Sequence, residues 1–153
     1  MMVQDQLYRT ISEYPLDFVE QRLIKKGGFN EATAKAAVEE LKKFLYICTV
    51  EEDKPIAMIS STVDEAWHTF ILFTKEYENF CRNIAGRFLH HQSIISDNDM
   101  RDVRIGVQNF IKSYQKYFGE IPTIWKEHSD DVEAICIRDP NECWQPPCDY
   151  PKP

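Results

Sequence analysis

Three of the four histidines in this chain lie within residues 63–91, and imidazole nitrogens are well suited to bind a transition metal near neutral pH. His68 lies near the start of a predicted amphipathic helix, and His90 and His91 are adjacent to each other just beyond its end. Adjacent residues point in different directions in a helix or a strand, so at most one of this pair can face His68. The segment therefore predicts a metal site made by His68 with His90 or His91.

Asp64 precedes His68 by about one helical turn. Its carboxylate can therefore reach the imidazole ring. A carboxylate that accepts a hydrogen bond from one ring nitrogen fixes the tautomer and leaves the other nitrogen able to bind a metal or accept a proton. We assign Asp64 this supporting position behind His68.

Two histidines do not complete a zinc site, because zinc usually takes at least three protein ligands. The candidates for the third ligand are Asp64, His128, Cys143 and Cys148. A second interpretation needs no metal, and in it His68 is a rim residue bonded to Asp64. His90 and His91 then cap the end of the helix or pack on Trp67. The spacing is less specific than a HExxH or paired CxxC motif, so both interpretations stay open.

The composition is that of an acidic globular chain. Its 153 residues are 43% hydrophobic and 28% charged, with a formal net charge of -7. We expect no nucleic-acid partner, because an acidic surface repels phosphates and the sequence has no long basic cluster. We expect no membrane partner, because no stretch approaches the ~20 apolar residues that span a bilayer. With no secretory signal visible, a cytoplasmic location is expected.

Apolar residues at helical spacing predict an all-α fold, a compact bundle of four main helices. The predicted helices cover residues 16–26, residues 30–48, residues 63–85, and a last segment that starts at 96–99 and ends at 118. Asn30 is a good N-cap for the second helix, and Thr62 and Glu65 have capping-box spacing for the third. Residues 56–59 form a short apolar connector or at most one short strand.

The predicted helical domain covers residues 1–138. Residues 139–153 are expected to form an irregular tail, because they hold five of the eight prolines. Cys48 and Cys81 lie on apolar helix faces and are expected to be free, buried thiols. Cys143 and Cys148 have a C-x4-C spacing, which suits a metal clip, an occasional disulfide or two unrelated thiols.

A set of residues with a distinctive order and spacing lies between positions 41 and 125. These residues are Val63, Asp64, Trp67, His68, Ile71, Leu72, Thr74, Tyr77, Cys81, Gly86, Arg87, Leu89, His90, His91, Tyr114, Phe118, Gly119 and Trp125. Their pattern resembles the VDxxWHxHIL and GRxLHH motifs of bacterial glycine-rich domain-containing proteins and, more distantly, a domain of plant glycine-rich domain proteins. The resemblance implies one coherent domain focused on residues 63–91, and it implies no particular activity.

Two departures from that family bear on function. Phe70 stands where the family's WHxH motif has its second histidine, and the glycine-rich tail does not occur in this sequence. We therefore expect a non-catalytic interaction or accessory protein with a protein partner. The alternative is a metal-binding protein or metal-dependent enzyme that uses His68 with His90 or His91 and a divalent transition metal such as zinc.

Overall fold

The computed structural model describes residues 2–26, 28–91 and 97–126, without the side chains of residues 2–5 and 97–103. Within these ranges the chain forms helices and no strand, so the predicted all-α fold is confirmed. The chain divides into two compact units. The first consists of Met1–Val50 and Thr62–His90, and the second consists of Glu51–Ser61 and His91–Pro153.

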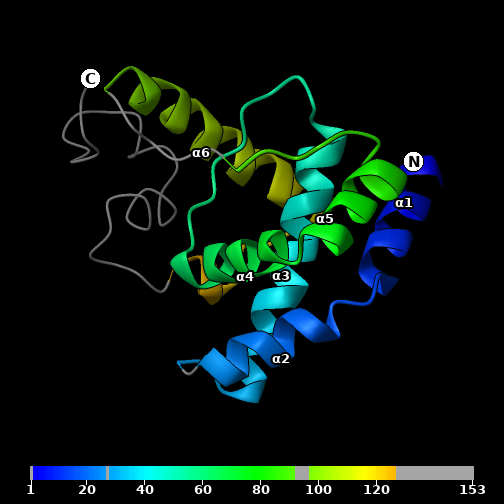
Figure 1. Cartoon of the computed structure of the whole chain (residues 1–153). Coiled ribbons are helices and arrows are strands. Elements are labelled where there is room, and N and C mark those ends of the chain that lie inside the picture. Colours follow the sequence, from blue (N-terminus) through cyan, green and yellow to red (C-terminus); the bar gives the residue numbers. More distant parts are fainter. Residues whose placement is uncertain (1, 27, 92–96, 127–153) are drawn as a thin grey trace. The chain divides into compact units, whose positions relative to one another are not determined.

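The first unit is built on α3, Glu31–Val50. Both α1, Met2–Glu13, and α2, Asp17–Lys26, pack against α3 (Figure 1). The Asn30 side chain caps α3 as predicted, because its Oδ1 accepts a hydrogen bond of 2.8 Å from the Thr33 N–H. The buried apolar side chains of α3 are Ala34, Ala37, Val38, Leu41, Phe44, Leu45, Tyr46 and Ile47. This helix therefore supplies much of the core of the first unit.

The structure adds α1, a helix that the sequence pattern does not predict. Its apolar stripe is short: Ile11 is fully buried, and Tyr8 lies edge-on to Tyr46 of α3 with ring centroids 5.4 Å apart. Most helical stability in proteins comes from tertiary packing. A stripe this short is easily missed in the sequence, and packing against α3 and residues 81–85 stabilises the helix that carries it.

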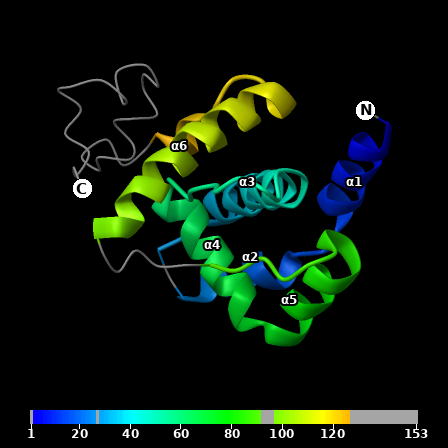
Figure 2. The same ribbon diagram turned by 90° about the horizontal axis from the view of Figure 1, so that it is seen from above.

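The prediction of one continuous helix over residues 63–85 is wrong. The structure divides this range into α4, Ser61–Leu72, α5, Thr74–Phe80, and a π-helix, Cys81–Ala85. Phe73 separates α4 from α5 with a backbone ψ of 73°, outside the helical range. Figure 2 shows α5 leaving this corner in a different direction from α4. Thr62 lies within α4, so the predicted capping box does not mark the start of the helix.

Aromatic packing explains the corner. The ring centroids of Phe70 and Phe80 lie 5.6 Å apart, and those of Phe70 and Tyr77 lie 5.0 Å apart. In one straight helix, ten residues would separate the backbones of Phe70 and Phe80 by about 15 Å. The corner lets the rings meet, and Phe73 itself packs on Phe18 of α2 with centroids 4.8 Å apart. An apolar stripe continues through such a corner, so its period does not reveal the break.

The second unit contains α6, Asp97–Phe118, and a 3-10 turn, Thr123–Trp125. Trp125 is fully buried and packs on Phe110 of α6 with ring centroids 4.5 Å apart. The Ser60 hydroxyl donates a hydrogen bond of 3.0 Å to the carbonyl of Ile124. The turn therefore joins α6 to the segment that precedes α4.

The helix α6 follows its predicted range closely. It is uninterrupted in Figure 1, and Gly119 ends it with a left-handed φ of +86°, as the sequence predicts. Residues 56–59 form no strand. The predicted tail, residues 139–153, lies outside the described residues, and the predicted domain, residues 1–138, extends beyond them; both stay predictions.

Glu51 links the start of the second unit to α6. One carboxylate oxygen accepts hydrogen bonds from the Tyr117 hydroxyl at 3.0 Å and the Ser113 hydroxyl at 3.4 Å. The other lies 3.2 Å from the Lys54 ammonium group. Burial by itself would raise the pKa of Glu51, but the hydrogen bonds from Lys54 and Tyr117 and the nearby lysine charges outweigh it and lower the pKa. The charged form of Glu51 therefore stabilises this unit.

The variant Gly106→Ala should destabilise the second unit by about 1–3 kcal/mol. A Cβ at Gly106 would lie 2.9 Å from the backbone nitrogen of Ala57 and 3.1 Å from its Cβ. Helix propensity alone favours alanine over glycine by about 1 kcal/mol, so a net loss would report the close approach of the two backbones. Urea unfolding followed by circular dichroism measures it. The exposed control Lys112→Ala should change stability by less than about 0.5 kcal/mol, and equal stability of the two variants would contradict the close approach.

The variant Glu51→Gln should remove a stabilisation that depends on pH. Because folding lowers the pKa of Glu51, its carboxylate stabilises the fold above the unfolded pKa of 4.5, and this contribution disappears as the pH falls through the folded pKa. Urea melts should show the wild-type chain more stable than Glu51→Gln at about pH 7, with the difference shrinking as the pH falls through the folded pKa of Glu51. The exposed control Glu120→Gln should show a smaller difference. A difference for Glu51 that grows as the pH falls would refute this role.

Candidate metal site

His68 lies on the solvent-facing side of α4, with 46% of its side chain exposed. Its Nε2 lies 3.4 Å from Oδ2 of Asp64, and its Nδ1 lies 4.0 Å from Oε2 of Glu65. The helix itself produces both distances, because residues three and four positions apart share one face. A carboxylate therefore lies near each ring nitrogen of His68.

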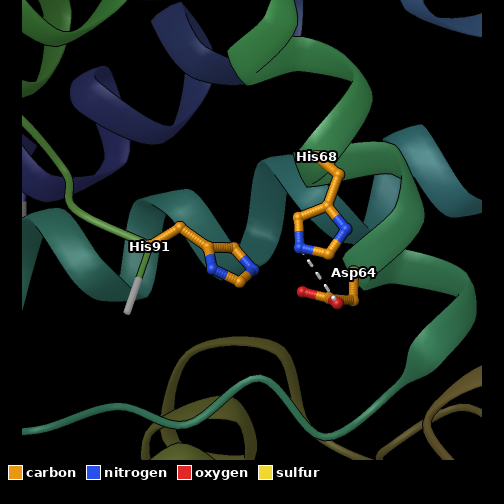
Figure 3. Close-up of side chains that lie close together, drawn as sticks. All are labelled: Asp64, His68 and His91. Atoms are coloured by element: carbon orange, nitrogen blue, oxygen red, sulfur yellow. Dashed lines mark ion pairs between the residues drawn. The ribbon is translucent and has the colours of Figure 1, made fainter. Parts of the chain in front are cut away.

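His91 lies beside the same pair. It directly follows His90, the last residue of the first unit, and it is partly buried. One ligand atom each from Asp64, His68 and His91 can be chosen so that all lie within 4.8 Å of one another. Figure 3 shows the imidazole of His91 pointing toward His68 and Asp64, and it marks the ion pair between the latter two. Three potential metal ligands therefore meet at one place.

His90 is not part of this group. It is exposed, and its ring packs against Phe88 with ring centroids 4.8 Å apart. Adjacent side chains in a non-helical segment point to different sides, which is why His90 and His91 have separate surroundings. Of the three predicted ligands, the structure brings together His68 and His91.

The spacing can be compared with a tetrahedral zinc site. Zinc lies about 2.0–2.2 Å from nitrogen and oxygen ligands, so two ligand atoms of a tetrahedron lie about 3.3 Å apart. The 3.4 Å between His68 Nε2 and Asp64 Oδ2 already fits that separation. The third atom, from His91, lies at most 4.8 Å from the others and needs only a small side-chain adjustment.

Residues 86–90 lead the chain from the π-helix to His91. Gly86 ends that helix with a left-handed φ of +80°, in agreement with its predicted role as a stop. The guanidinium group of Arg87 donates a hydrogen bond of 2.6 Å to the carbonyl of Cys48 on α3. This segment is therefore tied to the helices of the first unit and does not run freely between them.

Leu89 is held most closely. Its side chain is buried, and its N–H donates to Sγ of Cys81 at 3.5 Å. Its carbonyl accepts a hydrogen bond from the Tyr77 hydroxyl, which accepts one of 3.1 Å from Nε1 of Trp67. Burial raises the pKa of Tyr77, so the hydroxyl keeps its proton and can donate it. The sequence patterns place these side chains in the core, but they do not reveal that the polar atoms form a chain ending at Leu89.

The two described cysteines are free thiols, as predicted; Cys81 is buried, and Cys48 is partly buried. Burial raises the pKa of Cys48 to about 12 and also raises the pKa of Cys81. A protonated thiol is a weak nucleophile and a poor metal ligand. Neither cysteine therefore competes with the histidines as the reactive group of this region.

Glu65 is the site residue to which the sequence pattern assigns another role. Predicted as a capping residue, it lies next to His68 and forms an ion pair of 3.3 Å with Lys26 of α2. Its three-residue spacing from His68 is the signal that would identify it. The other candidate ligands, His128, Cys143 and Cys148, lie outside the described residues.

Comparison with known proteins places the chain in a family. A family model described as UCP032817-like matches residues 6–118, a range that includes the whole cluster from Asp64 to His91. The chain belongs to this family. A search of curated proteins and a search of solved structures each found no match. The family description states no activity and does not test the resemblance to glycine-rich domain-containing proteins.

No helix in the described part of the chain is long and apolar enough to cross a membrane. The expected cytoplasmic location and the expected protein partner stay predictions.

In the native protein, Cys48 and Cys81 should react slowly with a thiol reagent. Burial raises the pKa of both groups, so the reactive thiolate is scarce at neutral pH. Brief alkylation with and without denaturant, followed by peptide mapping in a mass spectrometer, measures each cysteine separately. Rapid native labelling of either residue, at the rate seen in denaturant, would contradict the burial of its thiol.

Proposed function

We propose that this chain binds a divalent transition metal, such as zinc, through Asp64, His68 and His91. The observation that supports the proposal is the approach of their three ligand atoms to within 4.8 Å of one another. Asp64 is then a ligand itself, because its Oδ2 lies 3.4 Å from Nε2 of His68, a separation that suits two ligands of one ion. This assignment replaces its supporting position behind His68.

The donor atoms favour a transition metal. Imidazole nitrogens suit zinc, copper, iron and nickel, whereas calcium and magnesium prefer sites made of oxygen atoms alone. Two imidazoles and one carboxylate leave one tetrahedral position for water, the arrangement of many catalytic zinc sites. We propose metal binding and no particular reaction, because the family description names none.

Glu65 fits the role of an outer carboxylate. With the metal at Nε2, the Nδ1 atom of His68 carries a proton and can donate it toward Glu65, whose Oε2 lies 4.0 Å away. Lys26 pairs with the other oxygen of Glu65 at 3.3 Å and thereby ties this carboxylate to α2. Such outer partners hold a metal-binding imidazole in one orientation.

An interaction or accessory role with a protein partner is the second candidate. Leu72, at the end of α4, is 71% exposed, which is unusual for a large apolar side chain. It lines an open cavity of about 310 Å³ together with Arg22, Thr69 and Phe73. Protein purified without a histidine tag that carries no metal and binds none would make this second role the favoured one.

The metal proposal predicts different outcomes for two adjacent histidines. In calorimetric titrations of tag-free, chelator-treated protein, His68→Ala and His91→Ala should each weaken zinc binding by more than about 100-fold, because each removes a ligand. His90→Ala is the matched control, since His90 is exposed and packs on Phe88 outside the cluster. It should bind zinc like the wild-type chain.

Stability measurements provide the second arm of this test. At a free zinc concentration 100 times the dissociation constant, binding should stabilise the wild-type fold by about 2.7 kcal/mol. The His68→Ala chain should fold normally, because His68 is half-exposed and contributes little packing, but zinc should not stabilise it. Equal binding by the His90→Ala, His91→Ala and wild-type chains would refute the assigned ligands, and no binding by the wild-type chain would refute the metal site itself.

A further inference from the structure

Leu89 lies two residues before His91 in a segment without helical structure. Each residue of an extended chain advances it by about 3.3 Å, so the backbone of Leu89 lies within about 7 Å of His91 along the chain. A displacement of Leu89 is therefore passed on to His91 through only two residues. Whatever holds Leu89 helps to decide where the His91 imidazole lies.

Two side chains of the first unit hold Leu89 by hydrogen bonds to its carbonyl and its N–H. The Tyr77 hydroxyl of α5 donates to its carbonyl, and Sγ of Cys81 accepts from its N–H at 3.5 Å. Nε1 of Trp67 on α4 donates to the Tyr77 hydroxyl at 3.1 Å and completes the chain of hydrogen bonds. Tyr77, Cys81 and Leu89 are each no more than 3% exposed, so water does not readily replace these bonds.

The hydroxyl of Tyr77 has no packing role that phenylalanine could not supply. The ring alone makes the contacts with Phe70 and with Phe88, at centroid distances of 5.0 Å and 5.4 Å. Burying a hydroxyl is costly unless it is hydrogen-bonded. The bonds of this hydroxyl to Trp67 and Leu89 connect α4 with the Leu89 segment, and these two parts of the chain carry the proposed ligands.

We propose that Tyr77 and Cys81 are positioning residues of the metal site. By holding Leu89, they place His91 beside His68 and Asp64. The inference rests on the proposed metal site, and it assigns Tyr77 and Cys81 no direct contact with the ion. Hydrogen bonds from residues around a metal site commonly orient its ligands. Here such bonds act on the backbone segment that carries the ligand.

The variants Tyr77→Phe and Cys81→Ala test the inference, because each removes one bond to Leu89 and keeps all three ligands. Calorimetric titration with zinc chloride should show a dissociation constant raised by about 10–100-fold in each variant. X-ray absorption at the zinc edge gives a readout that a loss of stability alone would not change. The average number of imidazoles per zinc should fall from two in the wild-type chain toward the single imidazole of His91→Ala.

Two controls separate positioning from general stability. Tyr14→Phe removes another tyrosine hydroxyl of the first unit, one that accepts a hydrogen bond of 3.0 Å from Asn79. Leu23→Ala empties a fully buried position on α2 and should lower the melting temperature. Both should keep wild-type zinc affinity and two imidazoles per zinc, measured at a temperature where circular dichroism shows them folded.

The outcomes distinguish the two proposals. If the wild-type chain binds no zinc, the metal site and its positioning residues are both wrong. If the wild-type chain binds zinc with two imidazoles, and folded Tyr77→Phe and Cys81→Ala do the same with equal affinity, only the positioning role is wrong. Should Tyr77→Phe fail to fold, Cys81→Ala decides alone, because it removes the other bond to Leu89 and leaves the Tyr77 hydroxyl in place.

Discussion

The corner at Phe73 is the feature on which the arrangement of the first unit depends. It turns α5 away from the direction of α4, so that Phe70, Tyr77 and Phe80 pack as one aromatic cluster. The same turn brings the Tyr77 hydroxyl to Nε1 of Trp67, although ten residues separate them in the chain. In a straight helix, the backbones of Trp67 and Tyr77 would lie about 15 Å apart. The Tyr77 hydroxyl could then not link Trp67 to Leu89 through hydrogen bonds.

In the proposed site, buried hydrogen bonds fix the backbone, and exposed side chains serve as the ligands. Tyr77 and Leu89 lie in the core, where each unmade hydrogen bond is expensive, so their arrangement is strongly determined. His68 and Asp64 lie at the surface of α4, where water can solvate them without a metal. The proposed ligands can therefore be held near one another without making the fold depend on the ion, unlike small zinc domains that unfold when the metal is removed.

The second unit is organised by different contacts. Gly106 of α6 approaches the backbone of Ala57, and Glu51 accepts hydrogen bonds from side chains of the same helix. Trp125 packs on the aromatic face of α6 beyond Gly119. Segments that precede and follow α6 in the chain thus use this one helix as a common support.

The sequence by itself determined the features that rest on local interactions. The Asn30 cap, the stop at Gly119 and the proximity of Asp64 to His68 all follow from spacing along a few residues of a helix. The all-α class follows in the same way, because helical periodicity reports which residues face a core. That periodicity does not show which side chains of other helices these residues contact in the core.

Only the tertiary structure decided the features that depend on distant partners. The helix α1 needs Tyr46 of α3, and the corner at Phe73 needs rings from both sides of the break. The choice of His91 over His90 depends on how Leu89 is held, and that in turn depends on Tyr77 twelve residues earlier. None of these contacts has a fixed sequence spacing. Each is set by how separate helices and segments pack together, and not by the periodicity of a single helix.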